Sequence, residues 1–370
     1  MKIIRKFLIL TLVVSLSLFV ISRGKIGDVP TSADAVDEGI TCALTKEDDV
    51  RISSRLLELL FGKNEEKDKV LLIPGGAIFG AKIKQKYVSV QNPGDIRGLK
   101  AGDKILSVNG TKVGCAIDVK NVIQAAEGNE IFMVCERDGK EISVKIVPAK
   151  SQGEYKLGLV LKDGAAGIGT VTYIDPETGE FGGLGHGICD TDTGEVIDFS
   201  EGRVTGVVLS GVKKGEEGKP GELSGLLTDK VMGVLYSNTE CGVFGKLDKI
   251  PDSLKGEAIE IAHRDEVHNG EATILSTVKV GCLKEFKINI SDIDKTSTGT
   301  KSFKIKVTDP ALIAITGGVV RGMSGSPIIQ DGKLVGAVTH VMVANPTEGY
   351  GIFIENMLNA ANNQSQQKAA

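Results

Sequence analysis

Short apolar stretches, separated by glycine, asparagine, aspartate and proline, recur along most of the chain. Their pattern predicts strands at Val204–Leu209, Val231–Tyr236, Ala272–Val280 and Phe303–Val307. Further on, two apolar runs flank Asp331-Gly332, a residue pair that favours a two-residue hairpin turn. Many short strands at this spacing are typical of sandwiches and barrels, so we expect a mainly β protein.

The start of the chain has a different pattern. Basic residues between Lys2 and Lys6 precede the uncharged apolar run Phe7–Ile21. This order is typical of an export signal or a membrane anchor, and we assign residues 1–23 to that role. The basic residues would keep the amino terminus in the cytoplasm and place the rest outside. Residues 24–67 are polar and charged, and we interpret them as a linker.

Residues 68–150 contain the block Gly98-Leu99-Lys100-Ala101-Gly102-Asp103-Lys104-Ile105-Leu106-Ser107-Val108-Asn109-Gly110. This block resembles a PDZ domain, with its helix expected at Asp118–Ala126 and a closing strand at Ile142–Ile146. The resemblance implies that a loop captures a chain terminus while an edge strand pairs with the peptide. The residues matching that loop are Ile78, Phe79, Gly80 and Ala81.

The strand-rich residues that follow, 151–360, contain a serine between glycines in Gly322-Met323-Ser324-Gly325-Ser326-Pro327. A serine becomes a nucleophile when a base removes its proton, and the resulting oxyanion needs backbone N–H donors. Gly322 can adopt unusual backbone angles, so the N–H groups of Gly322 and Ser324 are predicted to form an oxyanion hole. The alternative for this motif alone is a glycine-rich turn without a catalytic role. A polar, frayed tail is expected at 361–370.

The base that Ser324 requires must be one of only four histidines. Small residues flank His186 and leave its ring accessible, so we predict that His186 is the base. His263 and His268 lie in a charged stretch typical of a solvated turn. His340 falls on the strand after the predicted hairpin, where it would line the substrate pocket or the core. A serine loop that leads into a hairpin resembles the last segment of a chymotrypsin-like double β-barrel.

The segments around these residues resemble the SpoIVB peptidases, the stage IV sporulation proteins of endospore-forming bacteria. The matching segments are Lys156-Leu157-Gly158-Leu159, Asp175-Pro176-Glu177-Thr178-Gly179, Gly185-His186, Thr308-Asp309-Pro310, Gly322-Met323-Ser324-Gly325-Ser326-Pro327 and Gly336-Ala337-Val338-Thr339-His340-Val341. The resemblance implies a PDZ domain followed by a chymotrypsin-like double β-barrel peptidase domain, with Asp309 as the acid of the triad. Asp190 and Asp292 remain competitors, because chymotrypsin places its acid much further from its serine.

The resemblance also implies a role in sporulation signalling. Such a peptidase is exported, either membrane-anchored or secreted, and acts in the space between the forespore and mother-cell membranes. It cleaves itself and a regulator of an intramembrane protease, and thereby triggers activation of a sigma factor. Its PDZ domain would hold a peptide or a chain terminus. The alternative is a non-enzymatic adaptor that combines a PDZ domain with an inert β domain.

Composition adds two expectations. The net charge of -4 gives no basic footprint for nucleic acid, so we expect no nucleic-acid partner. The six cysteines are scattered without a Cys-x-x-Cys pair, which argues against a zinc site and favours free, buried thiols. Serine peptidase chemistry needs neither a metal nor an organic cofactor, and we expect none.

Overall fold

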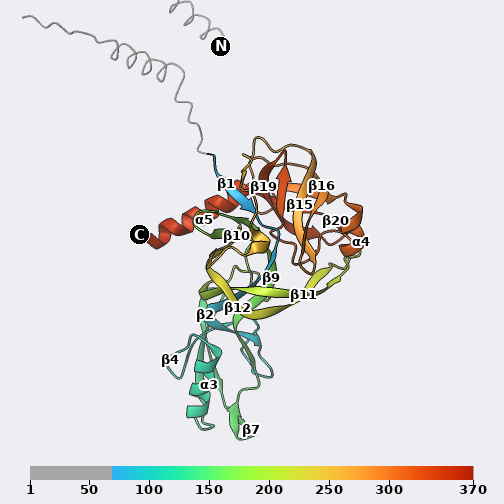
Figure 1. Cartoon of the computed structure of the whole chain (residues 1–370). Helices are drawn as coiled ribbons and strands as arrows, with labels where there is room; N and C mark the ends of the chain where they lie inside the picture. Colours follow the sequence, from blue (N-terminus) through green and yellow to red (C-terminus); the bar gives the residue numbers. More distant parts are fainter. Residues whose placement is uncertain (1–68, 370) are drawn as a thin grey trace, which may run out of the picture. The chain divides into compact units, whose positions relative to one another are not determined.

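The computed structural model describes residues 69–369, and the elements below all lie in that range. The predicted export segment, 1–23, and the predicted linker, 24–67, lie outside the described residues. The described part is mainly β, as the sequence predicts, and it contains a PDZ domain and two rings of strands (Figure 1).

The first ring, here called the first barrel, is closed because its last strand pairs with its first. Its strands, in order of pairing, are β2 (Ile78–Asn92), β9 (Val160–Ile174), β10 (Glu180–Gly183), β13 (Gly242–Leu247), β12 (Glu222–Thr239) and β11 (Phe199–Lys213). Two short strands extend it at β9, namely β1 (Leu71–Pro74) and β14 (Ile259–Glu260), and a 3-10 turn, η1 (Asp252–Leu254), precedes β14. Phe79 and Phe181 meet edge to face in its core, with ring centroids 5.6 Å apart.

The second barrel is closed by strands β15 (Gly270–Lys279), β16 (Cys282–Ser291), β17 (Phe303–Val307), β20 (Asn345–Phe353), β19 (Lys333–Met342) and β18 (Pro327–Gln330). Along β16, Phe286, Ile288 and Ile290 are buried while the residues between them are exposed, which is the two-residue period of a half-buried strand. Asp331 and Gly332 both have positive φ, 51° and 76°, as a two-residue hairpin turn of this kind requires. The predicted hairpin after the serine motif is therefore confirmed.

The PDZ domain lies between β2 and β9 in the chain. Its own elements are β3 (Lys104–Val108), β4 (Thr111–Lys112), α3 (Ala116–Ala125), β5 (Ile131–Arg137), β6 (Lys140–Ile146), β7 (Ala149–Ser151) and β8 (Glu154–Lys156). Val119 and Ile123 on α3 are buried against Ile131, Met133 and Cys135, which alternate along β5. The helix and the closing strand expected from the sequence are both present.

The order of the domains differs from the expectation that 68–150 form the PDZ domain and 151–360 the peptidase. Strand β2 is continuous, and its first half, Gly80–Gln85, pairs with β11 of the first barrel. Its second half pairs with β3 of the PDZ domain through Val88 and Ser89. The PDZ domain is therefore inserted into the β2–β9 hairpin of the first barrel. The alternating pattern of a strand does not identify its neighbours, so the sequence could not show this.

Helix α5 (Ile354–Ala369) follows the second barrel and also contacts the first barrel. Ile354 and Met357 are fully buried, in a cluster that includes Tyr173 and Phe244 of the first barrel and Ile352 of the second. The helix continues to Ala369 and so includes most of the polar residues expected to form the tail. Its buried first turns explain why a helix starts here, because packing of an apolar face supplies most helix stability.

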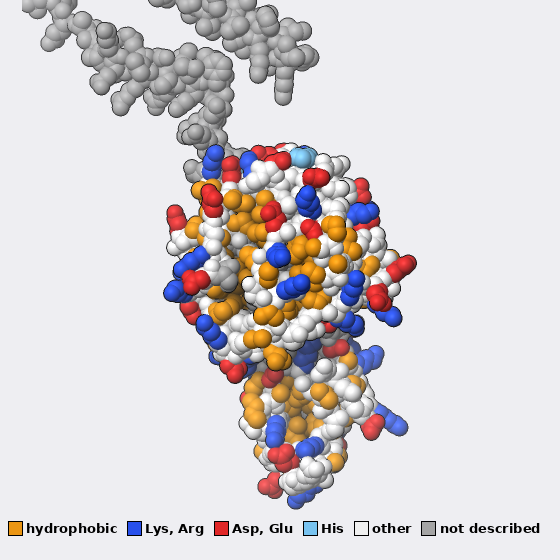
Figure 2. Space-filling view, turned by 45° about the vertical axis from the view of Figure 1, so that its right-hand side comes forward, with side chains coloured by type: hydrophobic (Ala, Val, Ile, Leu, Met, Phe, Trp, Pro, Cys, Tyr) orange, Lys and Arg blue, Asp and Glu red, His pale blue; other side chains and the backbone are white. Residues whose placement is uncertain are grey.

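The surface carries charges of both signs. On the face in Figure 2, acidic and basic side chains lie interspersed among apolar ones, without a continuous patch of one sign. Within residues 69–369, no helix is both long enough and apolar enough to cross a membrane.

The insertion can be tested by excising the PDZ domain. Lys84 pairs with Gly164, so joining them through Asn-Gly should close the hairpin of the first barrel with a favoured turn. We expect this variant to fold, with reduced stability, and to show a cooperative thermal transition by circular dichroism. Deleting 68–150 instead removes β1 and the buried Phe79, and should abolish folding. If the Asn-Gly variant failed to fold while the protein lacking 68–150 folded, the insertion would be contradicted.

Candidate active site

His186 follows β10 on a sharp bend. Leu184 and Gly185 both have positive φ, 67° and 66°, and turn the chain towards the second barrel. A Cβ added at Gly185 would lie 3.0 Å from Thr339 Cγ2, so glycine allows this loop to approach β19 closely. The His186 ring then lies beside the ring of His340 on β19, with centroids 5.3 Å apart.

Ser324 lies on the turn that enters β18. Its Oγ donates a hydrogen bond to the Thr339 carbonyl oxygen at 2.8 Å, one residue before His340. The next residue, Gly325, has φ +95°, and a Cβ there would lie 2.5 Å from Leu184 N. The serine turn and the histidine loop are thus packed together, one from each barrel. Ser324 contacts Thr339 and His186 lies beside His340, so the two predicted residues approach neighbouring positions of β19.

The two N–H groups predicted to form the oxyanion hole are available. Neighbouring N–H groups are occupied: Met323 N donates to Val320 O, and Gly325 N to Val338 O. Among the described residues, no acceptor receives a hydrogen bond from Gly322 N or Ser324 N. Gly322 has φ +96°, and Thr170 Oγ1 donates to its carbonyl oxygen at 2.8 Å, which fixes the peptide plane that follows.

Both histidines of the site favour the neutral form. Burial lowers the pKa of His186, although its contact with the Gly187 carbonyl offsets part of this effect. Burial lowers the pKa of His340 to about 4, and His186 and Lys301 contribute. His186 Nδ1 lies 2.9 Å from Gly187 O, which can only accept. Nδ1 therefore carries the proton in this contact, and Nε2 keeps a free lone pair suited to a base.

The predicted acid does not contact His186. The Asp309 carboxylate accepts from the N–H groups of Ala311 and Leu312 and caps α4 (Pro310–Thr316), and its other oxygen accepts from Lys287 N. Burial would raise the pKa of Asp309, but these backbone N–H groups hold it below its usual value. The aspartate of the Thr-Asp-Pro motif therefore serves as a helix cap. The carbonyl oxygen of Gly187 contacts His186 Nδ1, the atom that the carboxylate contacts in a triad.

The competitors have other partners as well. Asp292 forms an ion pair with Lys304 at 2.7 Å. Asp190 pairs with Lys162 at 2.9 Å, and both side chains are largely buried. Burial alone would raise the pKa of Asp190, but Lys162 and two backbone N–H groups hold it below its usual range.

The remaining histidines contact carboxylates outside this cluster. His263 Nδ1 lies 3.0 Å from Glu355, and the exposed His268 lies 2.7 Å from Asp331. The cysteines of the described part, Cys115, Cys135, Cys189, Cys241 and Cys282, are free, as expected, but only Cys135 is buried. No group of three or more metal-ligating side chains occurs in residues 69–369.

The sequence did not reveal the residues of β9 that support the site. Thr170 N donates to Ser324 O at 3.0 Å, and Thr172 Oγ1 donates to Gly325 O at 2.8 Å. Both side chains point from one strand into the serine turn of the other barrel. A threonine at every second position of a strand is a common pattern, so no signal distinguishes these two before the barrels are assembled.

Ile78–Ala81 do not form the peptide-binding loop of the PDZ domain. They lie in β2 and pair with β9 on one side, and Gly80 and Ala81 also pair with β11 on the other. Phe79 is only 1% exposed, in the core of the first barrel. Backbone groups that are already paired in a sheet cannot capture a carboxylate, so this prediction is wrong.

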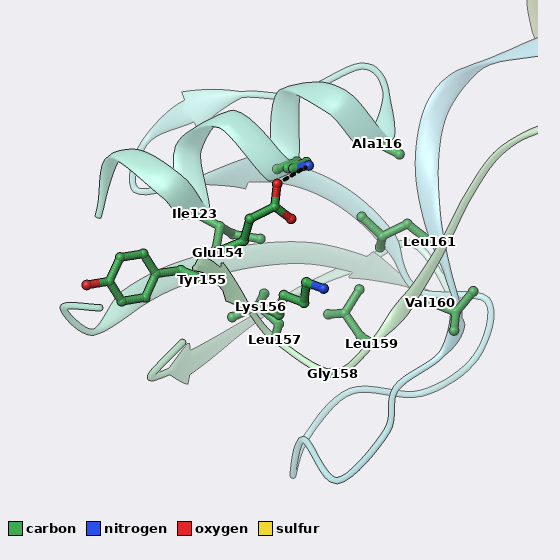
Figure 3. A pocket seen from close by; sticks show the side chains of 11 residues that line it. Ala116, Ile123, Glu154, Tyr155, Lys156, Leu157, Gly158, Leu159, Val160 and Leu161 are labelled. Carbon is green, nitrogen blue, oxygen red and sulfur yellow. Dashed lines mark hydrogen bonds and ion pairs between the residues drawn. The ribbon is translucent and has the colours of Figure 1, made fainter. Parts of the chain in front are cut away.

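A groove of 450 Å³ lies instead between α3 and the residues that lead into β9. Figure 3 shows Ala116 and Ile123 on the helix side, and Leu157, Leu159 and Leu161 along the opposite segment. From 160 to 170, β2 is the only described strand that pairs with β9, so the other edge of β9 is unpaired. Asp163 accepts a hydrogen bond from Ala116 N at 2.9 Å and holds the start of the helix against that edge.

The turn at the end of the groove carries free N–H groups. Gly158 has φ +73°, and no described acceptor receives a hydrogen bond from the N–H groups of Leu157, Gly158 or Leu159. The exposed Lys156 precedes them. The glycine between leucines in Lys156-Leu157-Gly158-Leu159, after the helix rather than before it, is the sequence signal that could have located this loop.

Comparison with known families gives two matches. The model of the SpoIVB peptidase S55 family matches residues 153–358, more than half of the chain, and a PDZ domain model matches 86–137. The PDZ match begins where β2 leaves the first barrel. It includes the helix side of the groove but ends before residues 154–161, which form the opposite side.

Curated relatives match over shorter stretches. A putative zinc metalloprotease of Brucella suis is 28% identical over 151 residues, 37% of this chain and 40% of the relative. Another of Lactococcus lactis is 40% identical over 63 residues, 17% of this chain and 15% of the relative. The chain therefore spans less than half of the length of these relatives. Among solved structures, the active form of the Rv3671c protease from M. tuberculosis is similar, with 13% identity, a TM-score of 0.32, and coverage of 54% of this chain and 74% of that one.

The role of Asp309 can be tested with two substitutions. Asparagine caps helices as well as aspartate does, so Asp309→Asn should keep both the fold and, within a few-fold, the reactivity of Ser324. Asp309→Ala removes the cap and should lower the free energy of unfolding by about 1 kcal/mol. Urea denaturation and the rate of labelling by a fluorophosphonate measure the two effects. A loss on the order of ten-thousandfold in folded Asp309→Asn would show a triad acid instead.

Proposed function

Because this chain belongs to the SpoIVB peptidase S55 family, we propose that it is a serine endopeptidase with Ser324 as nucleophile and His186 as base. The observation that carries the proposal is the packing of the serine turn of one barrel against the histidine loop of the other. That packing is accompanied by two free N–H groups beside the nucleophile, from Gly322 and Ser324. A nucleophile, a base and an oxyanion site are what acyl transfer requires.

In the proposed reaction, Ser324 Oγ attacks the carbonyl carbon of a peptide bond and His186 Nε2 takes the hydroxyl proton. The N–H groups of Gly322 and Ser324 donate to the oxyanion of the tetrahedral intermediate. His186 returns the proton to the leaving amine as the C–N bond breaks, which leaves an ester on Ser324. Water then attacks the ester, gives its proton to His186, and the acid product leaves as the serine is re-protonated.

The hydroxyl must leave its present partner for this to happen. Ser324 Oγ donates to Thr339 O, and no hydrogen bond joins it to His186 in the described residues. Hydrogen bonds of catalytic groups are often long or misaligned before substrate binds. We infer that rotation of the Ser324 side chain towards His186 accompanies assembly of the active arrangement, with Gly187 O orienting the imidazole.

The groove between α3 and β9 is the proposed peptide site of the PDZ domain. The unpaired edge of β9 can add an extended peptide as a further strand, and apolar residues line the groove for its last side chain. The free N–H groups of Leu157, Gly158 and Leu159, next to Lys156, suit a terminal carboxylate. The proposed ligand is therefore an extended peptide that ends in an apolar residue with a free carboxyl group.

The biological role follows from family membership and the amino-terminal sequence. We propose that the chain is exported and held at the membrane by residues 1–23, in the space between forespore and mother-cell membranes. Its substrates there would be its own chain and a protein regulator of an intramembrane protease, whose cleavage triggers sigma-factor activation. The rival function, a non-enzymatic adaptor, would use the same groove and leave Ser324 unreactive.

An active-site probe separates these two functions. A fluorophosphonate should label the folded protein at Ser324, and labelling should disappear in Ser324→Ala, which removes one hydroxyl from a loop. Ser326→Ala is a matched control, because Ser326 is fully buried and bonds to Ser276. Mass spectrometry locates the modified residue. Folded protein that never reacts, or that still reacts as Ser324→Ala, would exclude the peptidase.

The pH dependence of labelling provides a second test. The base must be neutral, and burial lowers the pKa of His186, so reactivity should fall only as pH drops below the usual value of about 6.5. The folded protein also favours the neutral forms of His186 and His340, so the free energy of unfolding decreases as pH falls below about 6.5. Circular dichroism at each pH must therefore show that the protein is still folded where labelling is lost. His268→Gln is the control, because His268 is exposed and has a raised pKa. It should leave the pH dependence of labelling unchanged. A midpoint above about 6.5 would contradict His186 as the base.

A further inference from the structure

Strand β9 connects the peptide groove to both candidate catalytic loops. Val160 and Leu161, at its start, line the groove, and Thr170 and Thr172, near its end, bond to the serine turn. The strand has 15 residues. At about 3.3 Å per residue, the stretch from Leu161 to Thr170 spans roughly 30 Å.

The serine turn is bonded to β9 through three of its carbonyl groups. Thr170 Oγ1 donates to Gly322 O at 2.8 Å, Thr170 N donates to Ser324 O at 3.0 Å, and Thr172 Oγ1 donates to Gly325 O at 2.8 Å. Ser324 N belongs to the peptide group that lies between the two whose carbonyls, of Gly322 and Ser324, are bonded to Thr170. A displacement of β9 along its axis would therefore move the peptide groups on both sides of this N–H donor.

The histidine loop is bonded to β9 as well. Leu184 N donates to Thr170 O at 3.2 Å, and Lys162 Nζ pairs with Asp190 Oδ2 at 2.9 Å. The side chains of Lys162 and Asp190 are 14% and 5% exposed, and Asp190 also accepts from the N–H groups of Asp192 and Thr193. Lys162 comes directly after the groove residues Val160 and Leu161. Buried pairs of this kind fix geometry, because separating the charges leaves an unpaired ion.

The ladder beside β9 is interrupted between the two domains. Lys84 of β2 pairs with Gly164, but the next pair is Ser89 with Lys162, so β2 bulges while β9 runs on. A bulge is a place where a sheet bends. The continuous strand and the Lys162–Asp190 pair thus span the point at which the PDZ domain and the first barrel can move relative to each other.

We propose that a peptide bound in the groove activates the peptidase through β9, with Lys162 and Asp190 as positioning residues for the histidine loop. This rests on the proposed function of both sites. Adding a strand to the free edge of β9 orders its first residues, and Lys162 transmits the new position to the loop that carries His186. The resting contact of Ser324 with Thr339 O is the state that the peptide disfavours. The ligand can shift this equilibrium only by binding the active arrangement more tightly, typically by about 5- to 150-fold.

The test uses the full chain, a fluorophosphonate, and hexapeptides that end in leucine, valine or isoleucine. Each peptide is compared with its carboxamide, and fluorescence anisotropy measures binding. We expect peptides with a free carboxylate to bind and to raise the maximal labelling rate of Ser324 at least about 5-fold, without changing the probe concentration needed for half-maximal rate. The carboxamides should do neither.

Substitutions then test the path. Lys162→Met keeps the length of the side chain without its charge, and should retain peptide binding but lose the acceleration; Asp190→Asn should do the same. Lys162→Arg keeps the ion pair with Asp190 and should keep the acceleration. If it does, the acceleration lost in Lys162→Met results from loss of the ion pair and not from misfolding. Lys145→Met is the matched control, because Lys145 lies on β6 and pairs with exposed Glu130. It should leave binding, basal labelling and acceleration unchanged.

The outcomes separate this inference from the proposed function. If peptides bind and Ser324 reacts at the same rate, coupling through β9 is wrong while the peptidase and the groove stand. Acceleration that survives in folded Lys162→Met and Asp190→Asn would overturn the role of the ion pair. If no carboxylate peptide binds, the groove assignment fails and the inference falls with it. Protein that binds peptide but never reacts with the probe would overturn the peptidase itself.

Discussion

The close approach of Gly325 to the first barrel is the contact on which the site depends. A Cβ at this position would lie 2.1 Å from Thr170 O and 2.5 Å from Leu184 N, closer than any real side chain can come. With φ at +95°, the residue also adopts a backbone conformation that other residues rarely tolerate. The histidine loop belongs to the first barrel and the serine turn to the second, and buried clusters join the two barrels. A glycine at the crossing lets backbone meet backbone, and each barrel then contributes one of the proposed reacting groups.

Features set by neighbouring residues were predictable from the sequence. The hairpin at Asp331-Gly332 follows from the need for positive φ at both turn residues, which is a local requirement. The helix of the PDZ domain and its closing strand were expected from the resemblance to that family, and both are present. Ser324 and His186 were selected as candidates from local chemistry, because few histidines were available and only one lay among small residues. The structure places their two loops against each other.

Features set by distant partners were not predictable. Gly80 resembles part of a loop in the sequence, yet a Cβ there would lie 2.0 Å from Leu227 Cδ2, so this glycine permits close packing inside a barrel. Asp309 precedes a proline, a pattern that suits both a catalytic aspartate and a helix cap, and the carboxylate caps α4. Lys162 and Asp190 are 28 residues apart and find each other only once β9 has joined both domains. For Gly80 and Lys162 the deciding contact lies far away in the chain, whereas the cap made by Asp309 is local and shares its sequence pattern with a catalytic aspartate.

The insertion changes what the PDZ domain can do. A domain that precedes its neighbour is joined by one segment, and a flexible linker lets it move without consequence for the neighbour. Here two paired strands, β2 and β9, leave the first barrel and enter the PDZ domain, so a displacement of the domain acts directly on strands of the barrel. One of them, β9, holds the serine turn through Thr170 and Thr172. The same strand therefore lines the groove at its start and is bonded to the serine turn near its end, which is the physical basis of the proposed coupling.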